Sequence, residues 1–197
     1  SLARPAFAVG ELSGMATARV QELAKLMGPV GKTRVTANLW GERWAKLIVN
    51  SMANPVAGLT GLGSAELRLR QETSNIAIKI AMEAMKVGRA LGIEVEPISG
   101  IPAQLFDQSV DSHNIEEIKA RLEDGASGLR GGRPSLLQDV LKGRLTEVDH
   151  LNGYVVIKGR ETGIPTPLNE AITNLVHRVE KGELKPDVSN IKYLEPS

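Results

Sequence analysis

The first 38 residues combine two strand-like segments with one helix-like segment. Residues 6–10 form an apolar run ended by glycine, which is typical of a buried strand, and residues 32–36 are rich in β-branched side chains, which predicts a second strand. Between them we expect a helix with one apolar face, beginning at Ser13 or Gly14. This order predicts α/β structure, but two strands do not form a stable sheet alone. We therefore interpret residues 1–38 as the end of a larger α/β domain.

From Asn38 onward, apolar residues recur at helical spacing. The predicted helices span residues 39–59, 73–91, 103–109, 114–123, 135–142 and 147–162, with a last one after Pro165-Thr166-Pro167. The four glycines within residues 125–134 predict a flexible loop, and the polar end from Lys181 predicts an extended tail. The sequence therefore predicts a mainly α domain over residues 39–197 that follows the short α/β segment.

Composition favours helices packed through aliphatic side chains, because aromatic residues make up 3% of the chain and hydrophobic residues 42%. The net charge is +1, and no basic stripe indicates a nucleic-acid partner. We find no signal peptide and no apolar run long enough to cross a membrane, so we expect a cytoplasmic protein without a membrane partner.

Cysteine and histidine usage limits the chemistry further. The absence of cysteine excludes disulfides, thiolate metal sites and a cysteine nucleophile. The three histidines form no i, i+4 pair, which indicates that there is no dedicated metal site. Because Ser1 falls within a predicted element, we expect this chain to be cut from a longer polypeptide.

The most informative polar pattern lies in the predicted helix 39–59. Lys46, Asn50 and Asn54 are spaced i, i+4 and i+8, so they share one helical face, whereas the residues between them are apolar or small. Buried amide and ammonium groups are costly without partners, so this stripe indicates either a polar binding pocket or a solvated edge. Pro55 leaves the carbonyl of Ser51 without its helical partner, and a kink with a free carbonyl beside Asn54 would suit a ligand pocket.

A second polar cluster spans residues 135–153. Ser135 occupies a position typical of a helix N-cap, where free amides and a hydroxyl could hold a carboxylate. Thr146 is a second candidate N-cap, with Glu147 and Asp149 in the following turn. Acidic first turns commonly serve only as helix caps, so Glu147 is a candidate for either capping or catalysis.

One glycine-rich segment is not a nucleotide-binding loop. Gly58-Leu59-Thr60-Gly61-Leu62-Gly63 has the spacing G-x-x-G-x-G and follows a helix, whereas the dinucleotide fingerprint is G-x-G-x-x-G after a strand. We interpret it as a helix-ending turn. The chain contains neither that fingerprint nor a Walker loop.

Four motifs stand out within residues 44–169. They are Trp44-x-Lys46-Leu47-x-x-Asn50-x-x-x-Asn54-Pro55, Ser135-Leu136-Leu137-Gln138-Asp139, Thr146-Glu147-x-Asp149-x-Leu151-Asn152-Gly153 and Gly163-Ile164-Pro165-Thr166-Pro167-x-Asn169. In order and spacing, these motifs resemble the ketopantoate reductase (2-dehydropantoate 2-reductase) family. The resemblance implies a Rossmann domain followed by a helical domain like that of 6-phosphogluconate dehydrogenase. Residues 1–38 would then be the end of the Rossmann domain, and residues 39–197 the helical substrate-binding and catalytic domain.

The resemblance also implies an NADP-dependent oxidoreductase that reduces 2-dehydropantoate to pantoate in pantothenate and coenzyme A biosynthesis. The lysine matching Lys46 is the family's general acid, and the residue matching Glu147 helps to bind and orient groups around the reacting centre. Residues matching Asn50, Asn54 and Ser135 hold the substrate's hydroxyl and carboxylate groups. NADPH would be bound mainly by the N-terminal domain that this chain lacks, so we expect no cofactor-binding residues here and no activity from the fragment alone.

Residues 101–133 match no motif of the family, which leaves the true substrate among 2-oxo acids open. One alternative is a related 2-oxo acid or opine-type dehydrogenase. Another is a non-catalytic helical dimerisation module, and the oligomeric state, with a homodimer as the candidate, stays open as well. If the enzyme hypothesis is right, Lys46, Asn50, Asn54, Ser135 and Glu147 should converge on one concavity.

Overall fold

The computed structural model describes residues 6–107, 112–125 and 132–194. Most of the predicted loop 125–134 lies outside the described residues, as does the predicted end of the 103–109 helix. Within the described part, the mainly α fold preceded by a short α/β segment is confirmed.

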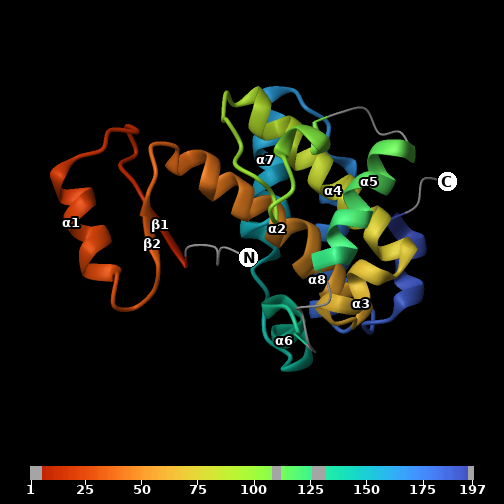
Figure 1. Cartoon of the computed structure of the whole chain (residues 1–197). Coiled ribbons are helices and arrows are strands. Elements are labelled where there is room, and N and C mark those ends of the chain that lie inside the picture. The colour runs from red at the N-terminus through yellow and green to blue at the C-terminus, as the bar shows by residue number, and fades with distance from the viewer. Residues whose placement is uncertain (1–5, 108–111, 126–131, 195–197) are drawn as a thin grey trace.

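The α/β segment consists of two strands and one helix. β1 (Phe7–Val9) and β2 (Thr33–Val35) pair in parallel, with Phe7 opposite Thr33, and α1 (Ala18–Met27) connects them. Figure 1 shows this segment at one side of the helical part, joined to it through the start of the next helix. The strand–helix–strand order therefore follows the sequence prediction.

The start of α1 was predicted too early. The helix begins after Thr17, whose hydroxyl accepts a hydrogen bond from the Val20 amide, and not at Ser13 or Gly14. Gly14 has a φ of 78°, which is a left-handed conformation that glycine tolerates and that does not start an α-helix. The true cap was therefore the next suitable hydroxyl along the chain.

Helix α2 (Leu39–Thr60) runs through the centre of the helical part and packs most extensively on α4 (Gln71–Ala90). The other elements are α3 (Ser64–Leu69), α5 (Ser112–Asp124), α6 (Ser135–Leu141), α7 (Asn152–Thr162), α8 (Pro167–Glu180) and the 3-10 helices η1 (Ala103–Phe106), η3 (Val148–His150) and η4 (Val188–Leu194). Helices α6 and α8 also pack directly against α2.

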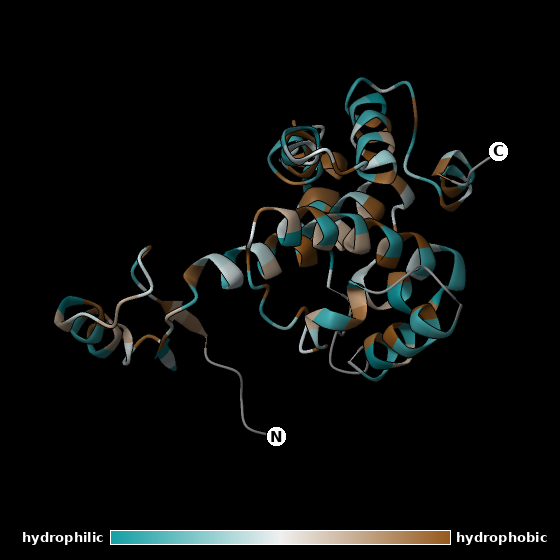
Figure 2. Cartoon of the chain, turned by 90° about the horizontal axis from the view of Figure 1, so that it is seen from above, coloured by the Kyte–Doolittle hydropathy of each residue, from teal (hydrophilic) through white to brown (hydrophobic). Residues whose placement is uncertain are grey.

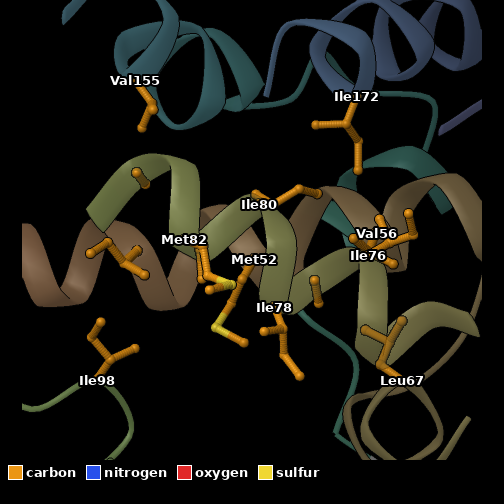
Figure 3. Close-up of a cluster of buried hydrophobic side chains, with 14 of the residues drawn as sticks. Met52, Val56, Leu67, Ile76, Ile78, Ile80, Met82, Ile98, Val155 and Ile172 are labelled. Atoms are coloured by element: carbon orange, nitrogen blue, oxygen red, sulfur yellow. The ribbon is translucent and has the colours of Figure 1, made fainter. Parts of the chain in front are cut away.

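The core of the helical part is built mainly from aliphatic and methionine side chains, as the composition predicted, with Trp44 and Phe106 as its buried aromatic residues. Met52 and Val56 of α2 meet Ile80 of α4, and Val155 of α7 and Ile172 of α8 approach from the other side (Figure 3). Each of these side chains is at most 5% exposed. Burying side chains of this size stabilises the fold by about 1.5–3 kcal/mol each.

The apolar face of α1 is not covered in the same way. On this face Val20 is buried, but Leu23 is 45% and Leu26 is 70% exposed. Figure 2 shows this segment set apart from the helical bundle. The α/β segment and the helical part therefore differ sharply in how much of their apolar surface the described residues cover.

The predicted extended tail was wrong. Residues 188–194 form η4, with Ile191 and Leu194 buried against the core. The Asn190 side-chain amide donates to the carbonyls of Leu59, at 3.1 Å, and Lys185, at 2.8 Å. The polar composition of this segment led to the wrong prediction, because Ile191 and Leu194, spaced i, i+3, are enough to dock it beside the end of α2.

Two further helix predictions need correction. Helix α3 was not predicted; it is short, and Glu66 stabilises its start by accepting a hydrogen bond from the Gly63 amide at 3.0 Å. The single helix predicted over 147–162 is divided into η3 and α7, because Leu151 leaves the helical conformation.

The glycine-rich segment at the end of α2 forms a helix-ending turn, as expected, and also serves packing, which was not predicted. Gly61 ends α2 in the left-handed conformation, with a φ of 77°. A Cβ atom at Gly58 would lie 2.2 Å from a methyl group of Leu136, so the missing side chain lets α6 approach α2 closely. This close approach brings the start of α6 beside the polar face of α2.

The carbonyl freed by Pro55 belongs to the fold and not to a ligand pocket, which corrects the sequence interpretation. The Asn152 side-chain amide donates to the Ser51 carbonyl at 3.1 Å and to the Asn169 side-chain oxygen at 3.0 Å. Helix α2 continues through the proline to Thr60. A buried amide from α7 thus replaces the hydrogen bond that proline removes.

The same buried network reaches α4 and the start of α8. The carboxylate of Glu83 accepts hydrogen bonds from the backbone amides of Leu168 and Asn169, at 2.9 and 3.0 Å, and from the Asn169 side chain at 2.8 Å. Burial raises the pKa of Glu83, although these hydrogen bonds act in the opposite direction. Ser51, Asn152 and Asn169 are all 0% exposed, so this network connects four helices inside the core.

Candidate active site

Lys46, Asn50 and Asn54 lie along one face of α2. The other side of the same turns carries Ile48 and Met52, which are in the hydrophobic core. Lys46 is exposed, whereas Asn50 and Asn54 are half-buried. The helix therefore presents core residues on one side and a polar stripe on another.

This stripe lines a cavity of about 230 Å³, which we call the α2–α3 cavity. Its lining residues are Lys46, Val49, Asn50, Met52, Ala53, Asn54, Ser64, Leu67, Arg68, Ser74, Ala77, Ser99, Leu122 and Pro134. Amides, hydroxyls and two cationic side chains thus interrupt an otherwise apolar wall. A mainly apolar cavity with a few polar groups is the usual form of a small-molecule site.

Lys46 also lines a second, more open cavity of about 900 Å³, which we call the α2–β1 cavity. Its wall includes Ala8 of β1, Arg34 of β2 and Arg43 of α2. Lys46 therefore borders both the α2–α3 cavity and the cavity that the α/β segment lines. A group at this position can act on a molecule bound in either cavity.

Ser135 and Glu147 are joined to the polar stripe by hydrogen bonds. The Asn54 side-chain amide donates to the Ser135 hydroxyl at 3.3 Å, and that hydroxyl donates to the Glu147 carboxylate at 3.1 Å. These residues come from α2, α6 and the segment before η3. The three side chains form one hydrogen-bonded chain at the edge of the α2–α3 cavity, next to Pro134.

The predicted capping roles of Ser135 and Thr146 were not correct in detail. Pro134 is the N-cap of α6, so Ser135 is its first helical residue and its hydroxyl makes no cap hydrogen bond. Glu147, and not Thr146, precedes the first residue of η3, although the Thr146 hydroxyl accepts from the Val148 amide at 3.3 Å. The Ser135 hydroxyl is therefore available to Asn54 and Glu147.

The segment that carries Glu147 is attached to α8. The Thr146 amide donates to the Glu180 carboxylate at 2.7 Å, and His177 lies between Glu180 and Asp149, with ring nitrogens 2.8 and 2.9 Å from their oxygens. Hydrogen bonds to Glu180 and then to Asp149 raise the pKa of His177. Burial acts to raise the pKa of Glu180, but the contacts with Thr146 and His177 hold it below its usual value.

The structure therefore brings the five predicted residues together as two groups that hydrogen bonds join. Lys46, Asn50 and Asn54 line one cavity, and Ser135 and Glu147 join it through the Asn54 side chain without being part of its lining. Their individual roles stay predictions.

Sequence reasoning missed other polar residues of the cavity, namely Ser64, Arg68, Ser74 and Ser99. Ser64 and Arg68 belong to the short helix that was not predicted. Ser99 lies in a tight turn between Ile98 and Ile101 and has a φ of 52°, a conformation that serine adopts at some cost. The proline- and glycine-bearing bend was a visible signal for that turn, but nothing in the pattern placed it beside α2.

No helix among residues 6–107, 112–125 and 132–194 is long and apolar enough to cross a membrane. The same described ranges contain no cluster of three or more His, Asp or Glu side chains arranged to hold a metal ion.

Comparison with known proteins identifies the family. The family model described as ketopantoate reductase PanE/ApbA C terminal matches residues 38–180. The chain therefore belongs to the ketopantoate reductase PanE/ApbA C-terminal family. It is 32% identical over 179 residues to a 2-dehydropantoate 2-reductase of Mesorhizobium japonicum, which covers 89% of this chain and 49% of that protein. It is 29% identical over 175 residues to a 2-dehydropantoate 2-reductase of Archaeoglobus fulgidus, covering 88% and 52%.

A solved structure of a related fold adds to this. The ternary structure of D-mandelate dehydrogenase with NADH and anilino(oxo)acetate is 25% identical to this chain, with a TM-score of 0.70. That match covers 88% of this chain and 65% of the other. The chain spans about half the length of the curated relatives it matches.

Proposed function

We propose that the intact protein carrying this chain reduces 2-dehydropantoate to pantoate, with NADPH as the hydride donor. The observation that carries this proposal is the joining of Lys46, Asn50, Asn54, Ser135 and Glu147 around the α2–α3 cavity. These are the residues that match the family motifs, and family membership supports the same activity. This chain would supply the substrate side of the active site.

In this proposal, Lys46 is the general acid. Reduction of a ketone places negative charge on its oxygen, and an ammonium group beside that oxygen stabilises the charge and donates the proton that completes the alcohol. The amides of Asn50 and Asn54 would hold the substrate's hydroxyl and carboxylate groups. Ser135, which already bridges Asn54 and Glu147, would fix the orientation of both.

The nicotinamide cofactor would supply a hydride to the ketone carbon, and the fit of this chain to that cofactor is only partial. In the wall of the α2–β1 cavity Arg43 could meet a phosphate, but Arg34 is ion-paired with Glu42, and the sequence has no G-x-G-x-x-G segment for a pyrophosphate. We therefore propose that the 197-residue chain alone neither binds NADPH tightly nor turns over. Tight, saturable binding in a fluorescence titration of this chain would contradict that.

A second candidate is the reduction of a different 2-oxo acid by the same chemistry. The similarity to D-mandelate dehydrogenase, solved with NADH and anilino(oxo)acetate, favours keeping it. Rates of the intact protein with 2-dehydropantoate, pyruvate and aryl 2-oxo acids, each with NADPH and NADH, distinguish the two. A non-catalytic dimerisation module would show no turnover with any of these acids. For the intact protein we propose a homodimer.

Substitution of Lys46 tests the proposed mechanism. In the intact protein, we expect Lys46→Met to lower kcat by about 10²- to 10⁴-fold, the usual contribution of a general acid, with the Kd for NADPH nearly unchanged. Lys25→Met, at an exposed lysine of α1 that lines neither cavity, is the matched control. Near-normal kcat in the Lys46 variant would exclude the assigned role.

A further inference from the structure

The α2–α3 cavity has an uneven charge. Two of its lining residues, Lys46 and Arg68, are cations, and none of the lining residues among those the structure describes is an aspartate or glutamate. The remaining polar lining consists of two asparagines and three serines. Such a lining favours an anionic ligand, because it offers two positive charges and no negative one, and the Glu147 carboxylate is joined to it through Ser135 and Asn54 without being part of it.

Arg68 reaches this cavity from α3 and is half-buried. It forms no ion pair with any residue that the structure describes. Burial lowers the pKa of its guanidinium, since charge is less well solvated there, and no neighbouring carboxylate offsets this effect. A half-buried guanidinium without an acidic partner is unusual, because buried charges are normally paired.

Arg68 also has a structural contact, with helix α5. Its Nη1 atom lies 3.5 Å from the carbonyl of Leu122, near the C-terminal end of α5, where a cation is favourable. That distance is at the limit of a hydrogen bond, and it engages one of the five N–H donors of the guanidinium. The contact with α5 therefore positions the side chain, and no other residue that the structure describes accepts a hydrogen bond from its remaining donors, which are available to a ligand.

We propose that Arg68, together with the asparagine amides assigned above, binds the carboxylate of the 2-oxo acid in the α2–α3 cavity and so restricts the site to acids. This inference rests on the proposed function and extends it to a residue that the family motifs quoted above do not include. Arginine presents paired N–H groups that match the two oxygens of a carboxylate, whereas the point charge of Lys46 suits the single ketone oxygen. The two cations would thus hold adjacent groups of one small substrate.

The size of the cavity agrees with this assignment. At about 230 Å³ it is smaller than the roughly 300–1,000 Å³ of sites for drug-sized ligands. A small acid that fills it would place its charged end close to both cations. The hydroxyls of Ser64 and Ser74 also line this cavity and could accept or donate hydrogen bonds to the same ligand.

Kinetics with a charged and an uncharged substrate test the proposal in the intact protein. We expect Arg68→Met to raise KM for 2-dehydropantoate roughly 10- to 100-fold, the loss typical of one hydrogen-bonded charged group, and to change KM for its primary amide less than about 3-fold. Arg68→Lys, which keeps the charge without the paired donors, should fall between. Arg70→Met is the control, because Arg70 is exposed and does not line the cavity.

The possible outcomes distinguish a failure of the Arg68 proposal from a failure of the proposed function. Equal losses for the acid and the amide would indicate a purely structural role at α5 and overturn the proposal, as would an unchanged KM for the acid. If the intact wild-type protein reduces no 2-oxo acid, the proposed function fails, and calorimetric titration with 2-dehydropantoate then tests Arg68 directly. Loss of that binding in Arg68→Met but not in Arg70→Met would support an anion site, and equal binding by both variants would exclude one.

Discussion

Two networks of polar side chains contact α2, one at Ser51 and one at Asn54, and they differ in burial and in function. At Ser51, the carbonyl is bound by Asn152, which continues to Asn169 and Glu83 inside the core. At Asn54, the side chain is half-buried and continues to Ser135 and Glu147, which are exposed. The first group joins helices, whereas the second leaves polar atoms that solvent or a ligand can reach.

The difference teaches that an amide on a family motif does not by itself mark a binding site. Asn152 and Asn169 lie in motifs as regular as that of Asn54, yet both are fully buried and bonded within the protein. A buried polar group without its partner costs more than an exposed one, because water cannot replace the lost hydrogen bond. Substitutions in the two groups should therefore affect different measurements.

The largest expected effect is on stability, at Asn169. Asn169→Ala removes the partner of Asn152 and leaves the Ile80 carbonyl and Glu83 carboxylate short of a donor, so we expect the free energy of unfolding to fall by about 3 kcal/mol. Urea denaturation measures this. Asn174→Ala, at an exposed position of the same helix, should change it by less than about 0.5 kcal/mol. Similar losses in both variants would contradict the proposed importance of the buried network.

A smaller effect, on activity and not on stability, is expected at Ser135. In the intact protein, Ser135→Ala should leave the free energy of unfolding within about 0.5 kcal/mol, because Ser135 is exposed and water can bind Asn54 and Glu147 in its place. We expect kcat/KM for 2-dehydropantoate to fall about 10-fold, equivalent to roughly 1.4 kcal/mol. A large loss of stability with unchanged kcat/KM would show that the hydrogen bonds among Asn54, Ser135 and Glu147 stabilise the fold and do not serve catalysis.

The smallest expected effect concerns His177, which holds the segment of Glu147 through Asp149 and Glu180. Its pKa is raised in the folded chain, so its contribution to stability is fully present below its unfolded pKa of about 6.5 and is lost as the pH rises through the higher folded value. Solvent screening limits this contribution to no more than about 1 kcal/mol. Comparing urea unfolding at pH 6 and pH 8.5 for the wild type and His177→Gln measures it.

The His177 result has a clear contrary outcome. The titratable groups that face His177 in the described residues are Glu180 on α8 and Asp149 on η3. If the wild type and His177→Gln lose stability equally between the two pH values, then this contact does not hold the segment, and the position of Glu147 depends on Thr146 and packing alone.

The sequence predicted the long helices and the polar stripe because both follow from local spacing along one element. Lys46, Asn50 and Asn54 share a face whatever α2 packs against. The partner of the Ser51 carbonyl, the docking of Ile191 and the cavity position of Arg68 could not be predicted in this way. Each depends on segments distant in sequence, such as Asn152 for Ser51 and Leu122 for Arg68.

The shared use of α2 by core and site has a consequence for how this protein can change during evolution. One inserted residue between Lys46 and Asn54 would turn the rest of the helix by about 100°, so Asn54 would leave the edge of the cavity and Val56 would leave the core. A single substitution along this segment therefore changes the contacts of one residue, whereas a change in its length moves every residue that follows. Members of the family that keep this site should show neither insertions nor deletions between these two positions, even where their loops differ in length.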